Sequence, residues 1–168
     1  TGDDALLRGS SSVPGCPPRF DSYYLDSNGR EPDELARDFT CIAQVGTGGC
    51  GLEQPLEAAL KALTPSTSPI RFALDSVGQG DGLNAGFLRP GSVLAIVLLT
   101  DEDDGSLANG SFVDATEEEL ALGGAWLHRI ERYAGGLVAL RGDDPSRLVV
   151  SVIAGLPPDL VPADAHTM

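Results

Sequence analysis

The sequence has little positive charge. Its 168 residues include 11 Lys and Arg against 25 Asp and Glu, which gives a formal net charge of −14, and Lys61 is the single lysine. A surface this acidic repels phosphate backbones, so nucleic acid is disfavoured as a partner. Divalent cations and basic surfaces are the partners that such a charge favours.

The sequence also lacks a long apolar run and paired zinc ligands. Its most apolar run, residues 92–100, is far shorter than the roughly 20 residues that cross a bilayer, and no signal peptide is recognisable. Three cysteines and two histidines do not show the paired spacing of a zinc site. Because the chain starts at Thr1 rather than Met, we expect a fragment or a processed product.

The three cysteines leave two interpretations open. Cys41 and Cys50 are close enough in sequence to bridge locally, which leaves Cys16 without a partner. In an oxidising compartment such a bridge would stabilise the fold by about 2.5–3 kcal/mol on the chain-entropy model. In a reducing compartment the cysteines would be small buried residues.

What is present indicates one soluble globular domain. Hydrophobic residues make up 42% of the chain, the mean hydropathy is near zero, and 168 residues suffice for a sizeable core. Residues 1–31 are rich in Gly, Pro and Ser, so we expect an extended, loop-rich segment. An α/β domain over residues 32–158 and an irregular tail over 159–168 complete the expected organisation.

The strongest signal is the apolar run 92–100 and the four acids that follow it, residues 101–104. A Val/Ile/Leu run without alternation predicts a central parallel strand that is buried on both faces. Ligands of open α/β sheets bind beyond the carboxyl ends of such strands, where Thr100 and Asp101 lie. The acids could ligate a cation through their oxygens, or they could form a solvated loop that ends the strand.

Helical patterns flank this strand. Pro32 suits a first helical position, and Leu35, Phe39 and Ile42 fall on one face of the helix that follows. Residues 52–63 predict a second helix, with Leu56, Leu60 and Leu63 facing the core. A threonine cap at residue 116 starts a further helical pattern.

The last part of the chain predicts a strand–helix–strand unit. An apolar stripe at residues 126, 130, 133, 137 and 140 indicates a core-facing helix, and residues 148–154 indicate a second buried strand. His128 lies off that stripe, so we expect it to be exposed and without a catalytic role. The fold class expected is α/β, a doubly wound and mainly parallel sheet with helices on both faces, incomplete at its N-terminus.

The glycine-rich turn 46–51 precedes the second helix. Free N–H groups at such a turn could hold an anion, but the turn lacks the Lys-Ser/Thr ending of a P-loop and the spacing of a dinucleotide fingerprint. A tight turn that requires glycine is the ordinary interpretation.

Three segments taken in order, residues 46–58, 84–89 and 98–104, resemble the von Willebrand factor type A-like domains of secreted bacterial lipoproteins, those of myxobacteria in particular. Arg132-Tyr133 and residues 152–157 are similar to the closing helix and strand of these domains. The resemblance covers about residues 32–158. It implies a doubly wound α/β fold, an extracellular or periplasmic location at the cell envelope, and membrane attachment only through a lipid anchor outside this chain.

The resemblance also implies a metal-ion-dependent adhesion site at the carboxyl end of the sheet. Asp101 matches the family's third-loop aspartate, and Thr47 is the available hydroxyl on the second loop, although Cys50 could align there instead. Asp103, with its acidic neighbours, would tune the charge or add a Ca²⁺ contact. The family's first-loop Asp-x-Ser-x-Ser motif does not occur in this chain, which indicates either a piece of a longer protein or a degenerate site.

The leading hypothesis is a non-catalytic protein-binding or adhesion module. A Mg²⁺ or Ca²⁺ ion held by Asp101, Thr47 and Asp103 would bridge to an acidic group of a protein ligand. A structural domain that has kept the fold and lost the metal is the alternative. A metal-assisted hydrolase is a third hypothesis, but no nucleophile–base pair lies near the acidic loop in sequence.

Overall fold

We describe the protein from a computed structural model, which describes residues 4–17, 24–44, 53–101, 103–108 and 127–155. In chain order the elements are α1 (Pro32–Ala43), α2 (Pro55–Leu63), a 3₁₀ turn (Ala73–Asp75), β1 (Leu94–Leu99), α4 (Ile130–Ala139), a second 3₁₀ turn (Pro145–Arg147) and β2 (Leu148–Ile153). The chain is therefore α/β. Within the described residues no helix is long and apolar enough to span a membrane.

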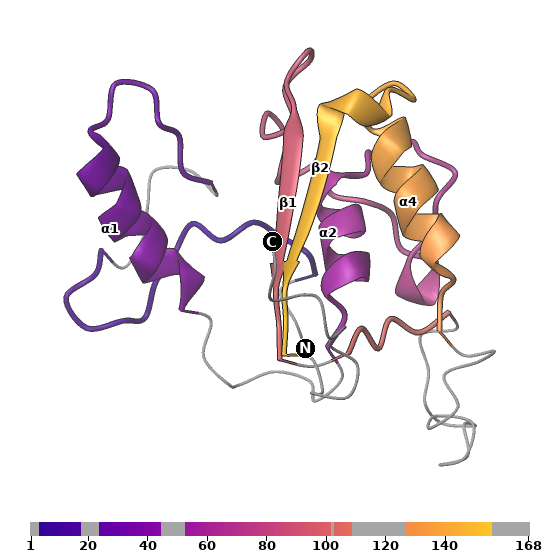
Figure 1. Ribbon diagram of the computed structural model, residues 1–168, viewed down its shortest axis with the longest axis horizontal. Coiled ribbons are helices and arrows are strands. Elements are labelled where there is room, and N and C mark those ends of the chain that lie inside the picture. Colours follow the sequence, from indigo (N-terminus) through magenta and orange to yellow (C-terminus); the bar gives the residue numbers. More distant parts are fainter. Residues whose placement is uncertain (1–3, 18–23, 45–52, 102, 109–126, 156–168) are drawn as a thin grey trace, which may run out of the picture.

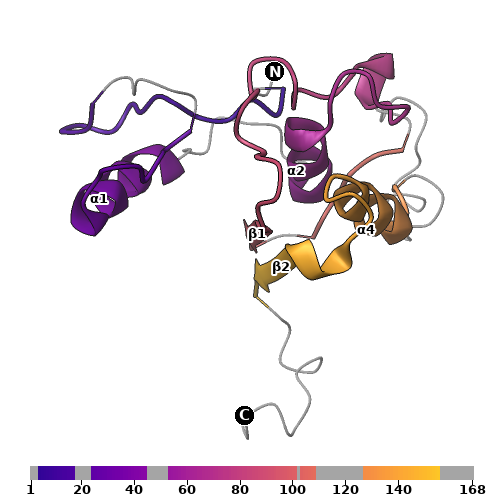
Figure 2. The same cartoon turned by 90° about the horizontal axis from the view of Figure 1, so that it is seen from above.

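The two strands pair in parallel, in the order expected for a strand–helix–strand unit. Leu94 lies opposite Leu148 and Leu99 opposite Ile153, and α4 falls between the strands in sequence. Figure 2 shows α2 and α4 on one side of the strand pair and α1 far from it on the other. The parallel unit is thus confirmed, while the described residues form a sheet of two strands.

The core lies between the strands and the two helices α2 and α4. Leu60 of α2 is completely buried and packs with Phe72, Tyr133 and Leu137. At Gly136 a Cβ atom would lie 2.8 Å from Leu60 Cδ1, so the glycine allows the two helices to approach closely. Gly135 and Gly136 are adjacent in α4, and glycine inside a helix normally weakens it. The close approach of Leu60 explains the glycine at position 136.

The strands are not buried on both faces, and that prediction is wrong. Alternate residues of β1 face the helices and the solvent, so that Val97 and Leu99 are 61% and 78% exposed. On β2, Val152 and Ile153 are exposed as well. On β1 the physical reason is that α2 and α4 cover one face only, and a strand's side chains alternate between faces. On β2 five consecutive residues, Val149 to Ile153, are exposed, so the helices of the described residues cover neither face of that stretch closely.

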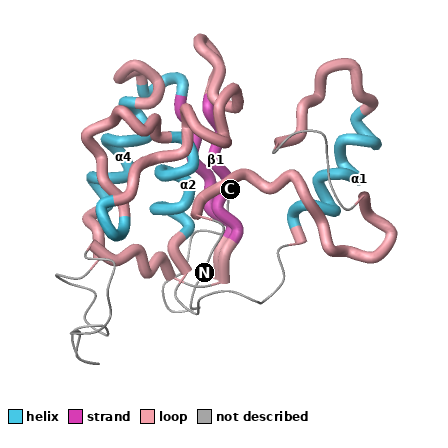
Figure 3. The backbone as a smooth tube through the Cα atoms, turned by 180° about the vertical axis from the view of Figure 1, so that it is seen from behind, coloured by secondary structure: helices cyan, strands magenta, loops and turns pink. Residues whose placement is uncertain are grey.

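Helix α1 begins at Pro32 as predicted, but its apolar face is not in the core. None of its residues is buried, and Phe39 is 61% exposed. Figures 1 and 3 show the helix apart from the strands and from α2 and α4.

The disulfide joins Cys16 to Cys41, with the two Cα atoms 5.8 Å apart, so the expected Cys41–Cys50 bridge is wrong; Cys50 lies outside the described residues. The chain near Cys16 runs back beside the end of α1, where the Ser11 hydroxyl donates a hydrogen bond to the Cys41 carbonyl at 2.8 Å. This proximity in space, rather than closeness in sequence, sets the pairing.

Candidate functional site

The three predicted metal ligands fall in two situations. Asp101 follows β1 after a single residue and is exposed, and Asp103 is exposed on the same loop. Thr47 lies outside the described residues. Within the described ranges no group of three or more His, Cys, Asp and Glu side chains is arranged to hold a metal ion.

Asp104, the last of the four acids, serves the fold. Its Oδ2 accepts a hydrogen bond from the Leu56 backbone N–H at 2.8 Å, and its Oδ1 accepts one from the Ser106 N–H at 3.0 Å. The first N–H groups of a helix have no partner within the helix and favour negative charge, so this carboxylate satisfies the start of α2. The next residue, Gly105, donates its N–H to the Glu53 carbonyl at 2.7 Å. The loop after β1 is therefore attached to the N-terminus of α2.

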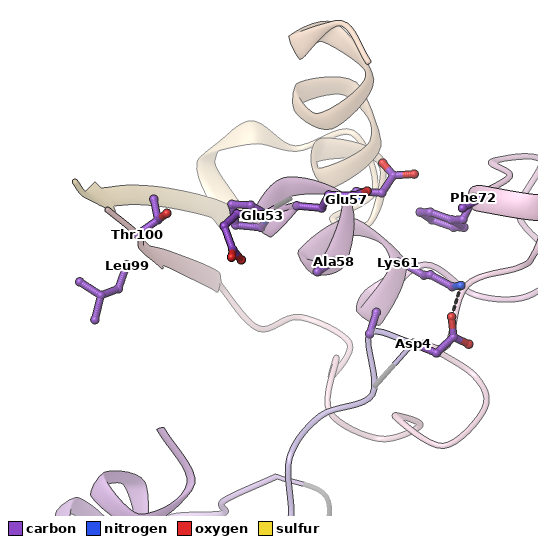
Figure 4. A pocket seen from close by; sticks show the side chains of 12 residues that line it. Asp4, Glu53, Glu57, Ala58, Lys61, Phe72, Leu99 and Thr100 are labelled. Carbon is purple, nitrogen blue, oxygen red and sulfur yellow. Dashed lines mark hydrogen bonds and ion pairs between the residues drawn. The ribbon is translucent and has the colours of Figure 1, made fainter. Parts of the chain in front are cut away.

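A crevice of about 560 Å³ opens between the carboxyl end of β1 and α2. Leu99 and Thr100 line it at the end of β1. Glu57, Ala58 and Lys61 line it from α2, and Glu53 lines it from two residues before that helix. Figure 4 shows these side chains with Phe72 and Asp4, which complete the wall. The crevice has the position in which α/β sheets bind ligands, beyond the carboxyl end of a strand.

Lys61 is the cation of this crevice, and it is nearly buried, at 8% exposed. Its ammonium group forms an ion pair with Asp4 and donates to Ser76 Oγ at 2.9 Å. The Nζ atom also lies 5.8 Å from the centre of the Phe72 ring, within the range of a cation–π interaction. The charge is thereby compensated, as a buried ammonium requires.

Glu57, on the neighbouring turn of α2, is paired with α4. Two bonds join its carboxylate to the guanidinium of Arg132, at 2.8 and 3.0 Å. Arg132 also donates to the Arg71 carbonyl at 2.7 Å and lies over the Phe72 ring, with 5.3 Å from Cζ to the ring centre. The bidentate pair connects α2 to α4 beside the crevice, in the fork geometry that suits Arg and carboxylate.

His128 lies beside Glu57, and the prediction that it is exposed is wrong. Its side chain is 19% exposed, and its Nε2 lies 3.6 Å from Glu57 Oε1. Burial lowers the pKa of His128, the nearby Arg132 charge lowers it further, and Glu57 and Asp104 oppose the change. The backbone explains the position, because the His128 N–H donates to the Ser106 carbonyl at 2.9 Å.

Two residues next to His128, Tyr133 and Ser106, carry hydroxyl groups. Both residues are almost completely buried, and neither hydroxyl meets the geometry of a hydrogen bond within the described residues. Burial raises the pKa of Tyr133 above its ordinary value, so the phenol is neutral. Neither hydroxyl is open to a substrate.

Comparison with protein-family models, with curated proteins and with solved structures finds no match to this chain.

Sequence reasoning missed the polar pairs around the crevice. Glu57 and Arg132 are 75 positions apart, and Lys61 and Asp4 are 57 apart. The available signal was the single lysine of the chain, which lies on α2 and has many possible acidic partners among 25 Asp and Glu. The spacing of the residues does not say which acid is chosen.

Proposed function

We propose that this protein is a non-catalytic, divalent-cation-dependent protein-binding module of the bacterial cell envelope. One observation carries the proposal: the exposed carboxylate of Asp101 stands directly beyond β1, next to Thr100, which lines the crevice. A carboxylate at that edge of an α/β sheet is suited to hold a cation that bridges to an acidic group of a partner.

The chemistry of the loop supports Mg²⁺ as the first candidate and Ca²⁺ as the second. Mg²⁺ keeps several of its waters and needs few protein carboxylates, which fits Asp101, Asp103 and the Thr47 hydroxyl as a sparse ligand set. Asp104 is engaged by the start of α2, so we do not assign it to the ion.

The resemblance to von Willebrand factor type A-like domains supports the same proposal. In that arrangement the parallel pair of β1 and β2 would belong to a larger, doubly wound sheet. The Cys16–Cys41 disulfide supports an extracellular or periplasmic location, because disulfides persist in oxidising compartments.

The test is thermal unfolding of the full chain with added Mg²⁺, Mn²⁺ or Ca²⁺ at constant ionic strength. At a metal concentration of 100 times Kd, binding to the folded state should stabilise the protein by about 2.7 kcal/mol and raise Tm accordingly. Asp101→Asn should abolish the rise.

Asp143→Asn is the matched control. Asp143 is exposed in a turn with φ of 60°, a conformation that Asn adopts readily, so this variant removes the same charge elsewhere. It should respond to metal as the parent does. Equal responses of the parent and Asp101→Asn would overturn the proposal.

A structural domain that has lost its metal site is the second candidate. The observation that favours it is the use of Asp104 to satisfy the helix start, which shows that part of the acidic run serves the fold. In that case none of the three ions raises Tm in the parent.

A further inference from the structure

The side of the strand pair that faces away from α2 and α4 is an exposed apolar surface (Figure 2). On this side Val97 is 61% exposed and Leu99 is 78% exposed. Residues that lie opposite each other in the parallel register point to the same side. We call this surface the outer face; it consists of Ala95, Val97, Leu99, Val149, Ser151 and Ile153. None of these residues is charged.

Helix α1 carries a second exposed apolar surface. A groove of about 480 Å³ runs along the helix and the segment before it, and we call it the α1 groove. It is lined by Leu25, Ser27, Pro32, Leu35, Ala36 and Phe39. Phe39 is 61% exposed, and α1 buries none of its residues. Contiguous apolar surfaces of this kind mark interaction sites.

The two surfaces match in length and in shape. Helix α1 has 12 residues and is therefore about 18 Å long, while β1 has six residues and is about 20 Å long. The α1 groove is hollow, and the side chains of a strand stand out from the sheet. A helix that lies along the strands with its apolar side against them is the usual cover of a sheet face in α/β folds.

The chain holds its own α1 away from its own outer face. Figures 1 and 3 show the helix apart from the strands. The disulfide ties Cys41 in α1 to Cys16, and before the helix the Tyr24 ring lies against Phe87, with 5.5 Å between ring centres. Each chain thus offers one helix surface and one sheet surface. Two copies related by a two-fold axis can cover all four, because such an interface makes each contact twice.

We propose that the protein forms a two-fold dimer in which the α1 groove of each copy covers the outer face of the other copy, with Phe39 over Val97. Judged from the exposed fractions of their side chains, the two surfaces expose on the order of 700 Å² per chain, so the dimer would bury about 1,400 Å², within the range of roughly 1,200–2,000 Å² for specific interfaces. Because both surfaces are uncharged, a chain with a net charge of −14 associates there without burying a charge. The dimer does not require a cation at Asp101.

The test is sedimentation equilibrium of the full chain at concentrations from about 1 to 500 µM, in about 0.5 M NaCl to screen the net charge. We expect a Kd on the order of 10 µM, so the chain is monomeric at the lowest concentration. The mass should rise from 17.4 kDa towards twice that value. Val97→Glu and Phe39→Glu each place a charge in one of the two surfaces and should each weaken association at least about tenfold. Both side chains are exposed in the monomer, so the variants keep the fold, which circular dichroism checks.

A mixture of the two variants tests the arrangement of the dimer. The Val97→Glu chain keeps its α1 groove and the Phe39→Glu chain keeps its outer face, so a mixed dimer has one unaltered contact and each variant alone has none. The mixture should associate at least about threefold more tightly than either variant alone. Thr67→Glu is the matched control: it adds the same charge at an exposed residue of the loop after α2 and should leave Kd within about twofold of the parent value.

Four results would overturn the proposal. The mass could stay at 17.4 kDa at every concentration, or Phe39→Glu could associate as the parent does, which would mean that sheet packs on sheet. The mixture could associate no more tightly than the separate variants, or Thr67→Glu could weaken the dimer as much as Val97→Glu, which would assign the effect to net charge. The site proposed at Asp101 is tested by its response to metal, so either proposal can fail without the other.

Discussion

Helices α1 and α2 have the same sequence pattern and different surroundings. Each has a proline in its first turn, an acidic first turn and an apolar stripe. Helix α2 buries Leu60 and Leu63 between β1 and α4, whereas α1 buries no residue. An apolar stripe thus predicts that a helix exists and which face is apolar, but not what covers that face.

The two helices are also held in different ways. Packing and the Glu57–Arg132 ion pair attach α2 to the rest of the core. Helix α1 is attached covalently, through Cys41 to Cys16, and by the hydrogen bond from the Ser11 hydroxyl to the Cys41 carbonyl. The difference separates a packed layer from a tethered helix, and three experiments test it.

The largest effect is expected from truncation of an apolar side chain in each helix. Leu60→Ala should lower the free energy of unfolding by about 3–4 kcal/mol, because it leaves a cavity in a completely buried site. Phe39→Ala should change it by less than about 0.5 kcal/mol, as is usual for an exposed position. Urea unfolding followed by far-ultraviolet circular dichroism measures both; similar losses would mean that α1 is packed as α2 is.

The second effect concerns the tether. A cross-link over 25 residues is worth at most about 3.5 kcal/mol on the chain-entropy model. We expect Cys41→Ser to raise amide hydrogen exchange in α1 and to leave exchange in α2 and α4 at the level of the parent. Cys16→Ser should reproduce the result, since both variants break the same bond. Loss of protection in α4 would show that the disulfide supports the core.

The smallest effect is the pH dependence of the packed layer. Folding lowers the pKa of His128 below its ordinary value of 6.5, first through burial and then through the charge of Arg132. The folded state then binds fewer protons than the unfolded state. The contribution of His128 to the free energy of unfolding is therefore present above about pH 6.5 and is lost as the pH falls towards the folded pKa. His128→Gln should flatten the fall in Tm between pH 6.5 and pH 5; an unchanged slope would assign that dependence to other groups.

The sequence could predict the helices and strands, but not which of their faces other elements would cover. The start of α1 followed from Pro32, whereas the second helix was expected from residue 52 and begins at Pro55. The parallel strands followed from two Val/Ile/Leu runs on either side of a helical stripe. The prediction that both strand faces are buried failed because apolar composition gives the same signal whether one or two faces are covered. Exposure of Leu99 and Ile153 depends on where the helices lie.

The site illustrates the same limit with polar residues. The position of Asp101 after β1 is local information, since it depends on where a strand ends. The pairing of Glu57 with Arg132, and the burial of His128 beside them, require α2 and α4 to meet. No periodicity along the chain encodes that meeting.

By itself, the sequence determined an acidic α/β chain, the ends of its two parallel strands and an acidic loop beyond the first of them. These properties depend on residues that are neighbours along the chain, whose spacing fixes helix, strand and turn. The tertiary structure alone decided that Cys16 pairs with Cys41, that Asp4 lies on Lys61, and that one face of β1 and most of β2 stay exposed. Each of these results depends on which distant segments come together in space, because the free energy of a contact depends on its surroundings as well as on the identity of the residues.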